Sequence, residues 1–475
     1  MLKINILDDT QLQTIAEAGY RLLETVGVEV QNAKALQILK KAGCSVEERR
    51  VKIPRSVVAK AVQSAPTSFQ VYDREGNEAM NLGGFNSYYG AGPTCPNYFD
   101  SYTGERRPAR KSDAAEAALV ADALPNIDYA MSLVMVGDQT RGLADLHEVD
   151  AMLRNTTKPI ATWAFNGHNA IAIIEMAAAV AGSLAALQEN PFLIVYAEPT
   201  TPLMHGADAM DKVMVLAENR IPCIYTPGML MGATAPVTLA GAMSVGAAEC
   251  LTGLVVHQMI SPGAPFIAGC AGNPMDMQHM KTPYGSPESI LIHAASGELW
   301  RYLGIPSFGL AGAPDTKTVD AQAGFETAMQ VLISGGCGSN LIHDVGFMDY
   351  GLTGSSRQLV FGNEVIGHAR RLMKGIDVDE EHLAYEVVKR VGPGGNFLGD
   401  EHTFAYFRKE IWTPQLSERR SYEEWEADGK KDLETVVGEK LIAILSNHKP
   451  SPLSSEVAAK LDAIVAREEK NLSNQ

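Results

Sequence analysis

The sequence predicts an α/β protein whose main part is a (β/α)8 TIM barrel, with an N-terminal cap and a C-terminal helical extension. From about residue 85 to residue 376, short apolar β-type runs alternate with alanine-rich helical patterns. The runs are apolar throughout, which is typical of parallel strands that helices cover on both faces. Several runs begin at a proline, such as Pro159 and Pro306, and the residue before a proline favours an extended backbone.

Eight strands are expected, with helical patterns between and after them. The strands lie at residues 87–90, 129–136, 159–163, 192–197, 222–226, 265–269, 306–310 and 340–343. The helical patterns lie near residues 112–123, 142–154, 169–187, 207–219, 236–260, 287–303, 319–334 and 356–374. Eight such units in series form a barrel. A doubly wound sheet is the alternative, although no Gly-x-Gly-x-x-Gly motif follows the first strand.

The chain divides into three parts according to its pattern of apolar and charged residues. We expect residues 1–80 to form a helical and mixed cap, residues 81–376 the barrel, and residues 377–475 a C-terminal helical segment. The cap begins with a helical pattern over residues 8–42, for which Asp9 is the expected N-cap. Because no low-complexity linker separates the last part from the barrel, we expect it to pack on the barrel.

Composition argues against several classes of protein. Of the 475 residues, 46% are hydrophobic and 20% are charged, which is the balance of a soluble globular protein. The net charge of −16, without a basic cluster, argues against a nucleic-acid partner. The six cysteines contain no Cys-x-x-Cys pair, so neither a disulfide framework nor structural zinc is indicated. There is no signal-peptide pattern and no apolar run of the roughly 20 residues that span a bilayer, so we expect a cytoplasmic protein without a membrane partner.

Aromatic and polar residues recur where the predicted strands end, which is the end at which barrel enzymes place their chemistry. Aromatic ring faces attract cations that cannot donate hydrogen bonds, such as a quaternary ammonium group. A single aromatic residue near a strand end more often packs in the core or at the rim than it binds a ligand. The prediction therefore depends on the recurrence of aromatic residues at the ends of several strands. The candidate substrate-binding residues are Tyr89, Tyr98, Phe99, Gln139, Trp163, Phe165, Asn166, Glu198, Thr200, Tyr225, Phe308, Phe347 and Tyr350.

The last predicted strand ends on His343 and Asp344, and His343 is the candidate catalytic residue. The alternative is a structural histidine held by the neighbouring carboxylate. Other site types lack a motif: the eleven histidines are dispersed, and neither Gly-x-Ser-x-Gly nor a phosphate-binding loop occurs. No metal ligands are therefore predicted. For Glu249, in an apolar helix, we expect structural hydrogen bonds, with a role in the site as the alternative. For Asp320, a cap of the helix that follows it and a substrate contact are the two alternatives.

Four segments resemble the trimethylamine methyltransferase superfamily, in the same order along the chain. They are Glu198–Leu203, Asp315–Glu326, Asn340–Gly346 and the stretch from Phe397 to Leu416. The resemblance implies a (β/α)8 barrel that moves a methyl group from a methylated amine to a cobalt corrinoid on a separate small protein.

The trimethylamine enzymes of that superfamily contain pyrrolysine, whereas this sequence has only standard residues. It therefore resembles the branch without pyrrolysine, whose members demethylate quaternary amines. This implies a betaine:corrinoid protein Co-methyltransferase, with glycine betaine as the expected substrate, in methanogenesis or acetogenesis. No tightly bound cofactor is expected, because the corrinoid (cobalamin) is carried by the partner protein. Proline betaine, carnitine and γ-butyrobetaine are alternative substrates. There are two alternative functions: a betaine-binding barrel without transfer activity, and an unrelated metal-dependent barrel lyase or hydrolase.

The resemblance also implies roles for the site residues. Aromatic walls would hold the N-methyl groups, while Asn166, Thr200, Gln139 or His343 would hold the substrate carboxylate. We expect His343 to position that carboxylate or to face the cobalt, with Phe347 and Tyr350 helping to close the mouth of the site. A homo-oligomer is expected because alanine-rich helix faces allow close self-association.

Overall fold

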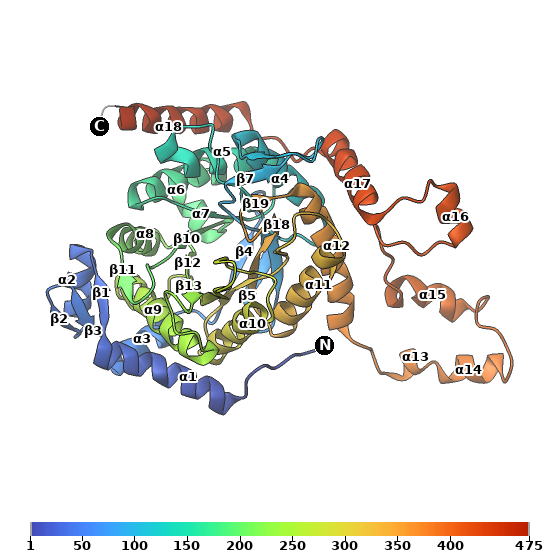
Figure 1. The fold of residues 1–475 in the computed structure, drawn as a ribbon, viewed down its shortest axis with the longest axis horizontal. Coiled ribbons are helices and arrows are strands. Elements are labelled where there is room, and N and C mark those ends of the chain that lie inside the picture. Colours follow the sequence, from blue (N-terminus) through green and yellow to red (C-terminus); the bar gives the residue numbers. More distant parts are fainter. Residues whose placement is uncertain (1, 474–475) are drawn as a thin grey trace.

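A seven-stranded parallel sheet forms the centre of the structure, a computed structural model that describes residues 2–473 (Figure 1). Its order is β6–β17–β16–β14–β12–β10–β9, and every neighbouring pair is parallel. Each strand lies within two residues of a predicted one. The strands are β6 (Tyr88–Ala91), β9 (Ile160–Trp163), β10 (Leu193–Ala197), β12 (Cys223–Tyr225), β14 (Phe266–Gly269), β16 (Ser307–Leu310) and β17 (Leu341–Val345).

The predicted strand at residues 129–136 is wrong as a strand. Only Tyr129 and Ala130 pair with the sheet, through single parallel bridges to Gly90 of β6 and Ile160 of β9. Leu133 adopts a left-handed backbone, with φ of 62°, which interrupts the extended conformation. The apolar run therefore links the two edge strands through two residues and then leaves the sheet. The mixed α/β parallel architecture is found, with seven continuous strands in place of the eight that were predicted.

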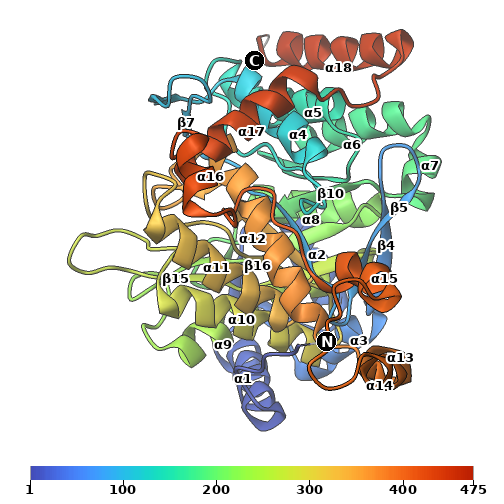
Figure 2. The ribbon, with the colours of Figure 1, turned by 90° about the vertical axis from the view of Figure 1, so that its right-hand side faces the viewer.

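Helices surround the sheet, as Figures 1 and 2 show. The predicted helix at residues 169–187 is divided, because Gly182 turns left-handed and Ser183 caps a second helix. The surrounding helices are α4 (Lys111–Ala123), α5 (Ala144–Asn155), α6 (Gly167–Ala181), α7 (Leu184–Glu189), α8 (Ala207–Glu218), α9 (Leu239–Ile260), α10 (Pro287–Tyr302), α11 (Ala321–Gly336) and α12 (Ser356–Lys374).

Helix α9 corrects the expectation that no apolar segment is long enough to span a bilayer. It has 22 residues and suitable hydropathy, but 83% of its most apolar window is buried inside the fold. The sheet lies on one side of α9, and the N-terminal helices pack on another. Close packing explains Gly19 of the first helix, because a Cβ there would lie 3.2 Å from Ala247 Cβ. Helix α9 is apolar because it is a core helix.

The N-terminal cap is more divided than predicted. The pattern over residues 8–42 forms α1 (Asp9–Arg21), a π-helical turn, β1 (Val28–Val30) and α2 (Ala33–Lys41). Asp8, not Asp9, is the N-cap of α1, and it forms a capping box with Gln11. The cap continues through β2 (Ser45–Glu47), β3 (Arg50–Lys52), α3 (Arg55–Ser64) and the hairpin of β4 (Ser68–Tyr72) and β5 (Glu78–Gly83).

Short strands extend the loops that follow the parallel strands. β13 pairs with β15 directly beyond β12 and β14, while β7, β8, β18 and β19 form a separate small sheet. Their bounds are β7 (Asn97–Phe99), β8 (Arg106–Pro108), β11 (Met204–His205), β13 (Gly228–Met231), β15 (Ala271–Pro274), β18 (Phe347–Met348) and β19 (Thr353–Gly354).

The C-terminal segment has two kinds of structure. Helix α17 (Leu433–Asn447) packs on α12 and α4, and α18 (Ser455–Ser473) packs on α6 and α5. Helices α13 (Glu380–Leu383), α14 (Tyr385–Val391) and α15 (Glu401–Glu410) contain no buried residue, and neither does α16 (Tyr422–Ala427), within the described part of the chain. The segment from α13 to α16 projects to the side of the sheet (Figure 1). The C-terminal segment therefore packs through α17 and α18, and through the stretch before α16, where Leu416 is buried and its N–H donates to Glu364 of α12.

Candidate active site

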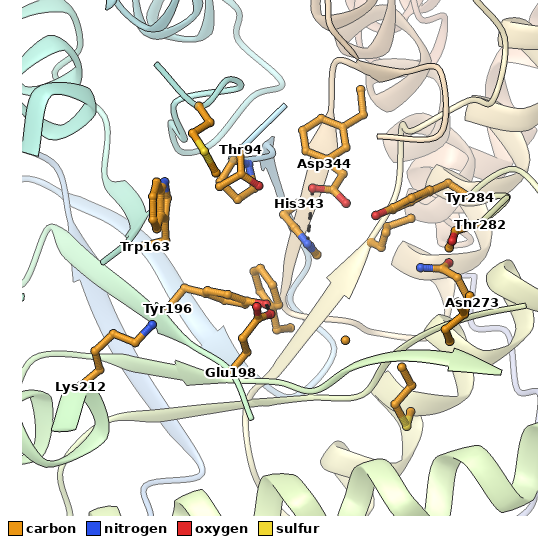
Figure 3. Close-up of a pocket in the computed structure, with 18 residues that line it drawn as sticks. Thr94, Trp163, Tyr196, Glu198, Lys212, Asn273, Thr282, Tyr284, His343 and Asp344 are labelled. Atoms are coloured by element: carbon orange, nitrogen blue, oxygen red, sulfur yellow. Dashed lines mark hydrogen bonds and ion pairs between the residues drawn. The ribbon is translucent and has the colours of Figure 1, made fainter. Parts of the chain in front are cut away.

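A cavity of about 520 Å³ opens where the parallel strands end (Figure 3). This volume lies within the range of small-molecule sites. Strands, loops and one helix contribute to its wall. The lining residues are Pro93, Thr94, Met135, Trp163, Tyr196, Glu198, Lys212, Gly228, Met229, Leu230, Asn273, Thr282, Tyr284, Phe308, Leu310, His343, Asp344 and Phe347.

Strand register brings the side chains of this cavity to one level. Trp163 of β9 is in register with Tyr196 of β10, and Leu310 of β16 is in register with His343 of β17. These residues are at or near the carboxyl ends of their strands, which is where α/β enzymes place their sites. The location of the site at this end of the sheet was predicted, and the cavity lies there.

Aromatic rings form much of the wall. The ring centres of Tyr196 and Phe308 lie 6.0 Å apart, and those of Tyr284 and Phe347 lie 6.5 Å apart. The His343 imidazole stacks on Phe308 with 3.9 Å between ring centres. Several electron-rich ring faces around one space favour a cationic ligand.

Two carboxyl groups face the same space, and neither is in an ion pair with a described lysine or arginine. Glu198 accepts a hydrogen bond from the Tyr196 hydroxyl. Asp344 is buried, its Oδ1 has no hydrogen-bond partner among the described residues, and burial raises its pKa well above the ordinary value. A carboxyl group without a cationic partner, in a wall of aromatic rings, is an unfilled site for a positive charge, and a bound cation would lower its pKa again.

His343 is a neutral imidazole with a fixed tautomer. Its Nδ1 lies 2.5 Å from the Gly309 carbonyl oxygen, which only accepts, so Nδ1 carries the proton. Burial lowers the pKa of His343 to about 4, although the Gly309 hydrogen bond acts in the opposite direction. At neutral pH its Nε2 is therefore an acceptor, 3.4 Å from Asp344 Oδ1. An acceptor cannot hold a carboxylate, which argues against the predicted role of His343 in positioning one.

A buried glutamate supports the tryptophan wall. The Trp163 indole N–H donates to Glu148 Oε2 at 2.8 Å, and the Val136 N–H donates to Oε1 at 3.1 Å. Burial raises the pKa of Glu148 to about 8. Phe165 packs edge-on against Trp163, with 4.5 Å between ring centres. These contacts fix the plane of the indole ring beside the cavity.

The loop that carries Tyr284 is held by the motif at residues 315–326. Asp315 accepts hydrogen bonds from the Tyr284 and Gly285 N–H groups at 2.8 and 3.1 Å. Burial raises the pKa of Asp315 to about 6. Asp320 caps α11 through the N–H groups of Gln322 and Ala323, the first of its two predicted alternatives. This motif is therefore a support for the cavity wall.

Five of the predicted site residues line the cavity. They are Trp163, Glu198, Phe308, His343 and Phe347. Of the others, Phe165 touches the site indirectly through Trp163. Gln139, half-buried, and Thr200, which pairs with Met204 in a turn, do not line the cavity.

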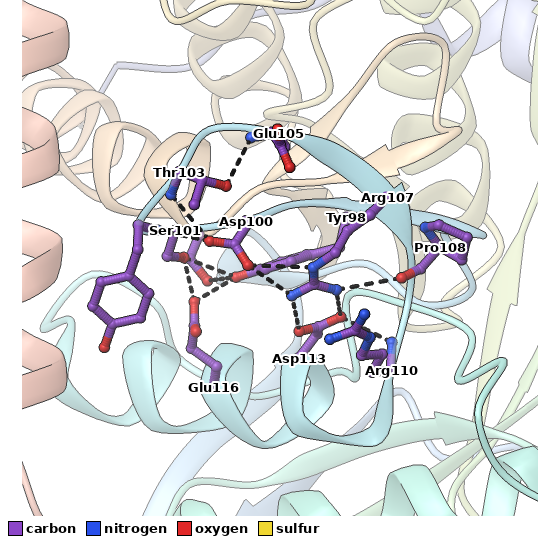
Figure 4. A network of polar contacts seen from close by, with 12 residues as sticks. Tyr98, Asp100, Ser101, Thr103, Glu105, Arg107, Pro108, Arg110, Asp113 and Glu116 are labelled. Atoms are coloured by element: carbon purple, nitrogen blue, oxygen red, sulfur yellow. Dashed lines mark hydrogen bonds and ion pairs between the residues drawn. The ribbon is translucent and has the colours of Figure 1, made fainter.

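Tyr98 and Phe99 lie away from the cavity, in the small sheet formed with β8. The Tyr98 hydroxyl donates to Glu116 at 2.5 Å and lies 2.6 Å from Ser356 Oγ (Figure 4). Arg107 joins Asp100 and Asp113 next to it, with bonds to Asp113 of 2.7 and 2.9 Å. We call this set the Arg107 network: Tyr98, Asp100, Ser101, Arg107, Asp113 and Glu116. Every polar side chain in it has a protein partner, so the predicted substrate contact of Tyr98 is corrected to a structural role.

The remaining predicted residues also have structural partners. The Tyr89 hydroxyl donates to the Val331 carbonyl at 3.0 Å, and the Tyr225 hydroxyl lies 2.7 Å from His205 Nδ1. Asn166 caps α6, and Tyr350 lies under the Lys317 ammonium group at 4.0 Å. The sequence places these residues near strand ends, but none of the four lines the cavity.

Glu249 has the structural role that was expected. It is buried in α9, where the Leu203 N–H and the Thr201 hydroxyl donate to it. Burial raises the pKa of Glu249 to about 7. The bonds hold the turn that follows β10 and Glu198.

Sequence reasoning missed Lys212, Thr282 and Tyr284 of the cavity wall. Lys212 lies on α8, on a face otherwise occupied by buried apolar residues such as Ala209, Val213 and Leu216. A lysine within such an apolar stripe is a signal that could have been used, because lysines are rarely buried without a reason. Thr282 and Tyr284 lie in a loop whose course depends on Asp315. No local sequence pattern indicates that these two residues reach the cavity.

The fold and this cavity are those of a parallel α/β enzyme that acts on a small molecule. The model of the trimethylamine methyltransferase (MTTB) family matches residues 1–473. The chain belongs to this family and is a methyltransferase. The predicted family and its branch without pyrrolysine are confirmed, and the alternative of an unrelated barrel lyase or hydrolase is wrong.

Two relatives named as methyltransferases are similar over nearly their full length. Glycine betaine methyltransferase of Desulfitobacterium hafniense (strain Y51) is 32% identical over 477 residues, covering 100% of this chain and 99% of that protein. Trimethylamine methyltransferase MttB of Methanosarcina thermophila is 32% identical over 471 residues, covering 97% of each chain. Among solved structures, monomethylamine methyltransferase (MtmB) of Methanosarcina barkeri has a TM-score of 0.50 at 11% identity, over 98% of this chain and 87% of that chain. That last likeness concerns the fold alone.

Proposed function

We propose that the protein transfers a methyl group from a quaternary amine, foremost glycine betaine, to the Co(I) corrinoid of a partner protein. The observation that carries the proposal is the cavity wall, in which aromatic rings surround two carboxyl groups without a cationic partner. A tetraalkyl ammonium group carries a fixed positive charge and no N–H, so it is recognised by rings and carboxylates. The likeness to a glycine betaine methyltransferase supports the same substrate class.

We also infer that the sheet works as a closed barrel. Tyr129 and Ala130 bridge the edge strands β6 and β9, so the bridging segment occupies the position of the missing strand. In this arrangement the cavity lies at the mouth of the barrel, and the loops after β6, β12 and β14 form its rim.

The reaction is an in-line displacement at one methyl carbon. The C–N bond breaks with its electron pair left on nitrogen, and the cobalt of the methyl acceptor supplies the pair for the new bond to carbon. The amine therefore leaves as an uncharged tertiary amine, and no proton has to be delivered. A neutral His343 fits this chemistry, because an imidazolium there would repel the substrate.

The residues of this chain have two tasks in such a displacement. The rings of Trp163, Tyr196 and Phe308 would restrict the ammonium group, so that one methyl group points toward the mouth of the cavity. Orientation of this kind can supply several kcal/mol of the barrier reduction. Glu198 and Asp344 would hold the positive charge at a fixed depth below the acceptor.

The cavity suits an amine and not a corrin ring. Its volume of about 520 Å³ is ample for glycine betaine, whereas a corrin macrocycle is many times larger than this substrate. The corrinoid would therefore reach the methyl group from outside, carried on the partner protein. This is why we propose that the chain itself binds no cofactor tightly.

The proposal is tested with free cob(I)alamin as the methyl acceptor under anaerobic conditions. The purified protein is expected to cause loss of the Co(I) absorbance with glycine betaine, with dimethylglycine formed in equal amount, and much less loss with trimethylamine. Proline betaine, carnitine and γ-butyrobetaine are tested in parallel. Calorimetric binding of a betaine without any loss of Co(I), with cob(I)alamin or with a reduced corrinoid protein, would identify a betaine-binding barrel and contradict the proposed transfer.

A further inference from the structure

Lys212 is a buried lysine whose ammonium group faces the cavity. Its side chain reaches from α8 toward Tyr196 (Figure 3), and the residue is only 8% exposed. The Nζ donates one hydrogen bond, to the Ala164 carbonyl at 2.9 Å. An ammonium group has three donors, so two of them have no partner among the described residues.

No described carboxylate forms an ion pair with Lys212. Burial lowers its pKa, while Glu198, Asp145 and Asp208 raise it from a distance. A buried charge without a close counter-charge is costly, and proteins retain such a charge where a ligand completes it. The missing partner of Lys212 is therefore an anion that enters through the cavity.

A half-buried lysine, Lys158, gives the structural alternative. Lys158 donates to three backbone carbonyls, those of Ala121, Leu124 and Ile127, at 2.7, 2.6 and 2.5 Å. All three of its donors are satisfied by protein, and burial lowers its pKa to about 8. Lys158 does not line the cavity. The contrast shows that this fold can satisfy all three donors of a half-buried lysine, whereas it leaves two donors of the buried Lys212 without a described partner.

Several other polar groups near the cavity are poor holders of a carboxylate. His343 presents an acceptor nitrogen, Glu198 and Asp344 are acidic, and Asn166 is engaged as a helix cap. Neutral donors also line the cavity: the hydroxyl groups of Thr94, Thr282 and Tyr284, and the amide of Asn273, whose Oδ1 accepts from Ser289 at 2.6 Å. Asn273 is a neutral donor, and hydrogen bonds from a charged donor are stronger.

We propose that Lys212 binds the carboxylate of the substrate and thereby selects zwitterionic betaines over quaternary amines that lack an acid group. This inference rests on the proposed function and defines one end of the same site. The ammonium group would lie among the rings and the two carboxyl groups, with the carboxylate turned toward α8. The length of the spacer between the two charges would then decide which betaine fits best.

Calorimetry without any methyl acceptor tests the inference. Glycine betaine and choline carry the same trimethylammonium group, but only the first has a carboxylate. The wild-type protein is expected to bind glycine betaine at least 10-fold more tightly than choline. Lys212→Met is expected to lower the affinity for glycine betaine about 10-fold to 100-fold, which corresponds to the loss of a charged hydrogen bond. The affinity for choline is expected to change less than about two-fold.

Lys158→Met is the matched control, since it removes a half-buried lysine that does not line the cavity. It is expected to lower stability and to leave the preference for glycine betaine unchanged. Equal losses for both ligands in Lys212→Met, or an unchanged preference, would overturn the inference. If Asn273→Leu loses the preference for glycine betaine over choline and Lys212→Met keeps it, the carboxylate is held by Asn273 and the role proposed for Lys212 is wrong. If Lys212→Met does not fold, equal binding of the two ligands by the wild type would overturn it without any variant.

The outcome is separable from that of the proposed function. Selective binding that depends on Lys212, without transfer to cob(I)alamin or to a reduced corrinoid protein, would support the inference and contradict the methyl transfer. If the protein transfers the methyl group and Lys212→Met still prefers glycine betaine over choline, the methyl transfer is supported and the role proposed for Lys212 is contradicted.

Discussion

The Arg107 network and the cavity are built from the same kinds of side chain, but only one of them is complete. In the network, Arg107 bonds to Asp113 and Asp100, and the buried Tyr98 bonds to Glu116. In the cavity, Asp344 Oδ1 has no hydrogen-bond partner and Lys212 uses one donor of three, within residues 2–473. A satisfied cluster stabilises the fold, whereas an unsatisfied one in a cavity is arranged for a ligand.

This difference also explains why the strand-end aromatics could be misassigned. Tyr98 and Trp163 both follow the pattern of an aromatic residue near a strand end. The Tyr98 side chain turns into the network, and the Trp163 ring faces the cavity while its N–H is held by Glu148. Partners, rather than residue type, separate the two roles.

The largest expected effect comes from the charge in the cavity. Glu198→Gln is expected to lower kcat/KM for glycine betaine about 100-fold, because loss of a charge opposite a buried cation costs roughly 2–5 kcal/mol. The measurement is initial rates of cob(I)alamin methylation. Glu116→Gln in the Arg107 network is the control and is expected to stay within about two-fold of wild type. Similar losses in both variants would contradict the distinction between the two clusters.

Breaking the network should affect stability instead. Arg107→Met is expected to lower the free energy of unfolding by about 2 kcal/mol, because it leaves Asp113 buried without its cation. Denaturant titration measures this loss, and kcat/KM is expected to remain unchanged. A large fall in kcat/KM with normal stability would place Arg107 in the site and contradict the comparison.

The aromatic wall gives a smaller effect. Trp163→Leu is expected to raise KM for glycine betaine about 10-fold, in line with the strength of a desolvated cation–π contact. Trp163→Phe keeps a ring and should lose less. Tyr98→Phe is the matched change in the network, expected to leave KM unchanged while lowering stability, since Glu116 loses a donor. An altered KM in Tyr98→Phe would be the contrary result.

The smallest expected effect is a change in stability at Asp344, and its direction depends on pH. Burial raises its pKa in the folded state above that of the unfolded chain, so folding at neutral pH requires a proton or a buried charge. Asp344→Asn is therefore expected to raise the melting temperature by roughly 2 °C at pH 7 and by nothing near pH 3, where both states are protonated. Methyl transfer should fall at the same time. Destabilisation at pH 7 would show that Asp344 is structurally satisfied.

Much of the fold was predictable because local pattern determines it. The apolar runs and the alanine-rich helical patterns predicted seven strands within two residues. The run at residues 129–136 was equally apolar, and its failure depends on the left-handed Leu133, which apolar periodicity does not reveal. The division of residues 8–42 likewise depends on a π-helical turn that ends at Gly27.

The site was predictable only where the strands themselves carry it. Trp163, Phe308 and His343 are strand residues, so their position followed from the barrel rule. Lys212 and Tyr284 reach the cavity from a helix and a loop, and their approach depends on tertiary packing. The sequence marked Lys212 only as a charge within an apolar stripe, which becomes informative when its hydrogen bonds can be counted.

The most direct test of the central claim is a crystal structure of the protein with glycine betaine bound. We expect the trimethylammonium group between the rings of Trp163 and Phe308, close to Glu198 and Asp344, with the carboxylate on Lys212 Nζ. A betaine bound outside this cavity, or bound with its carboxylate among the rings and its ammonium group at Lys212, would contradict both the proposed function and the proposed role of Lys212.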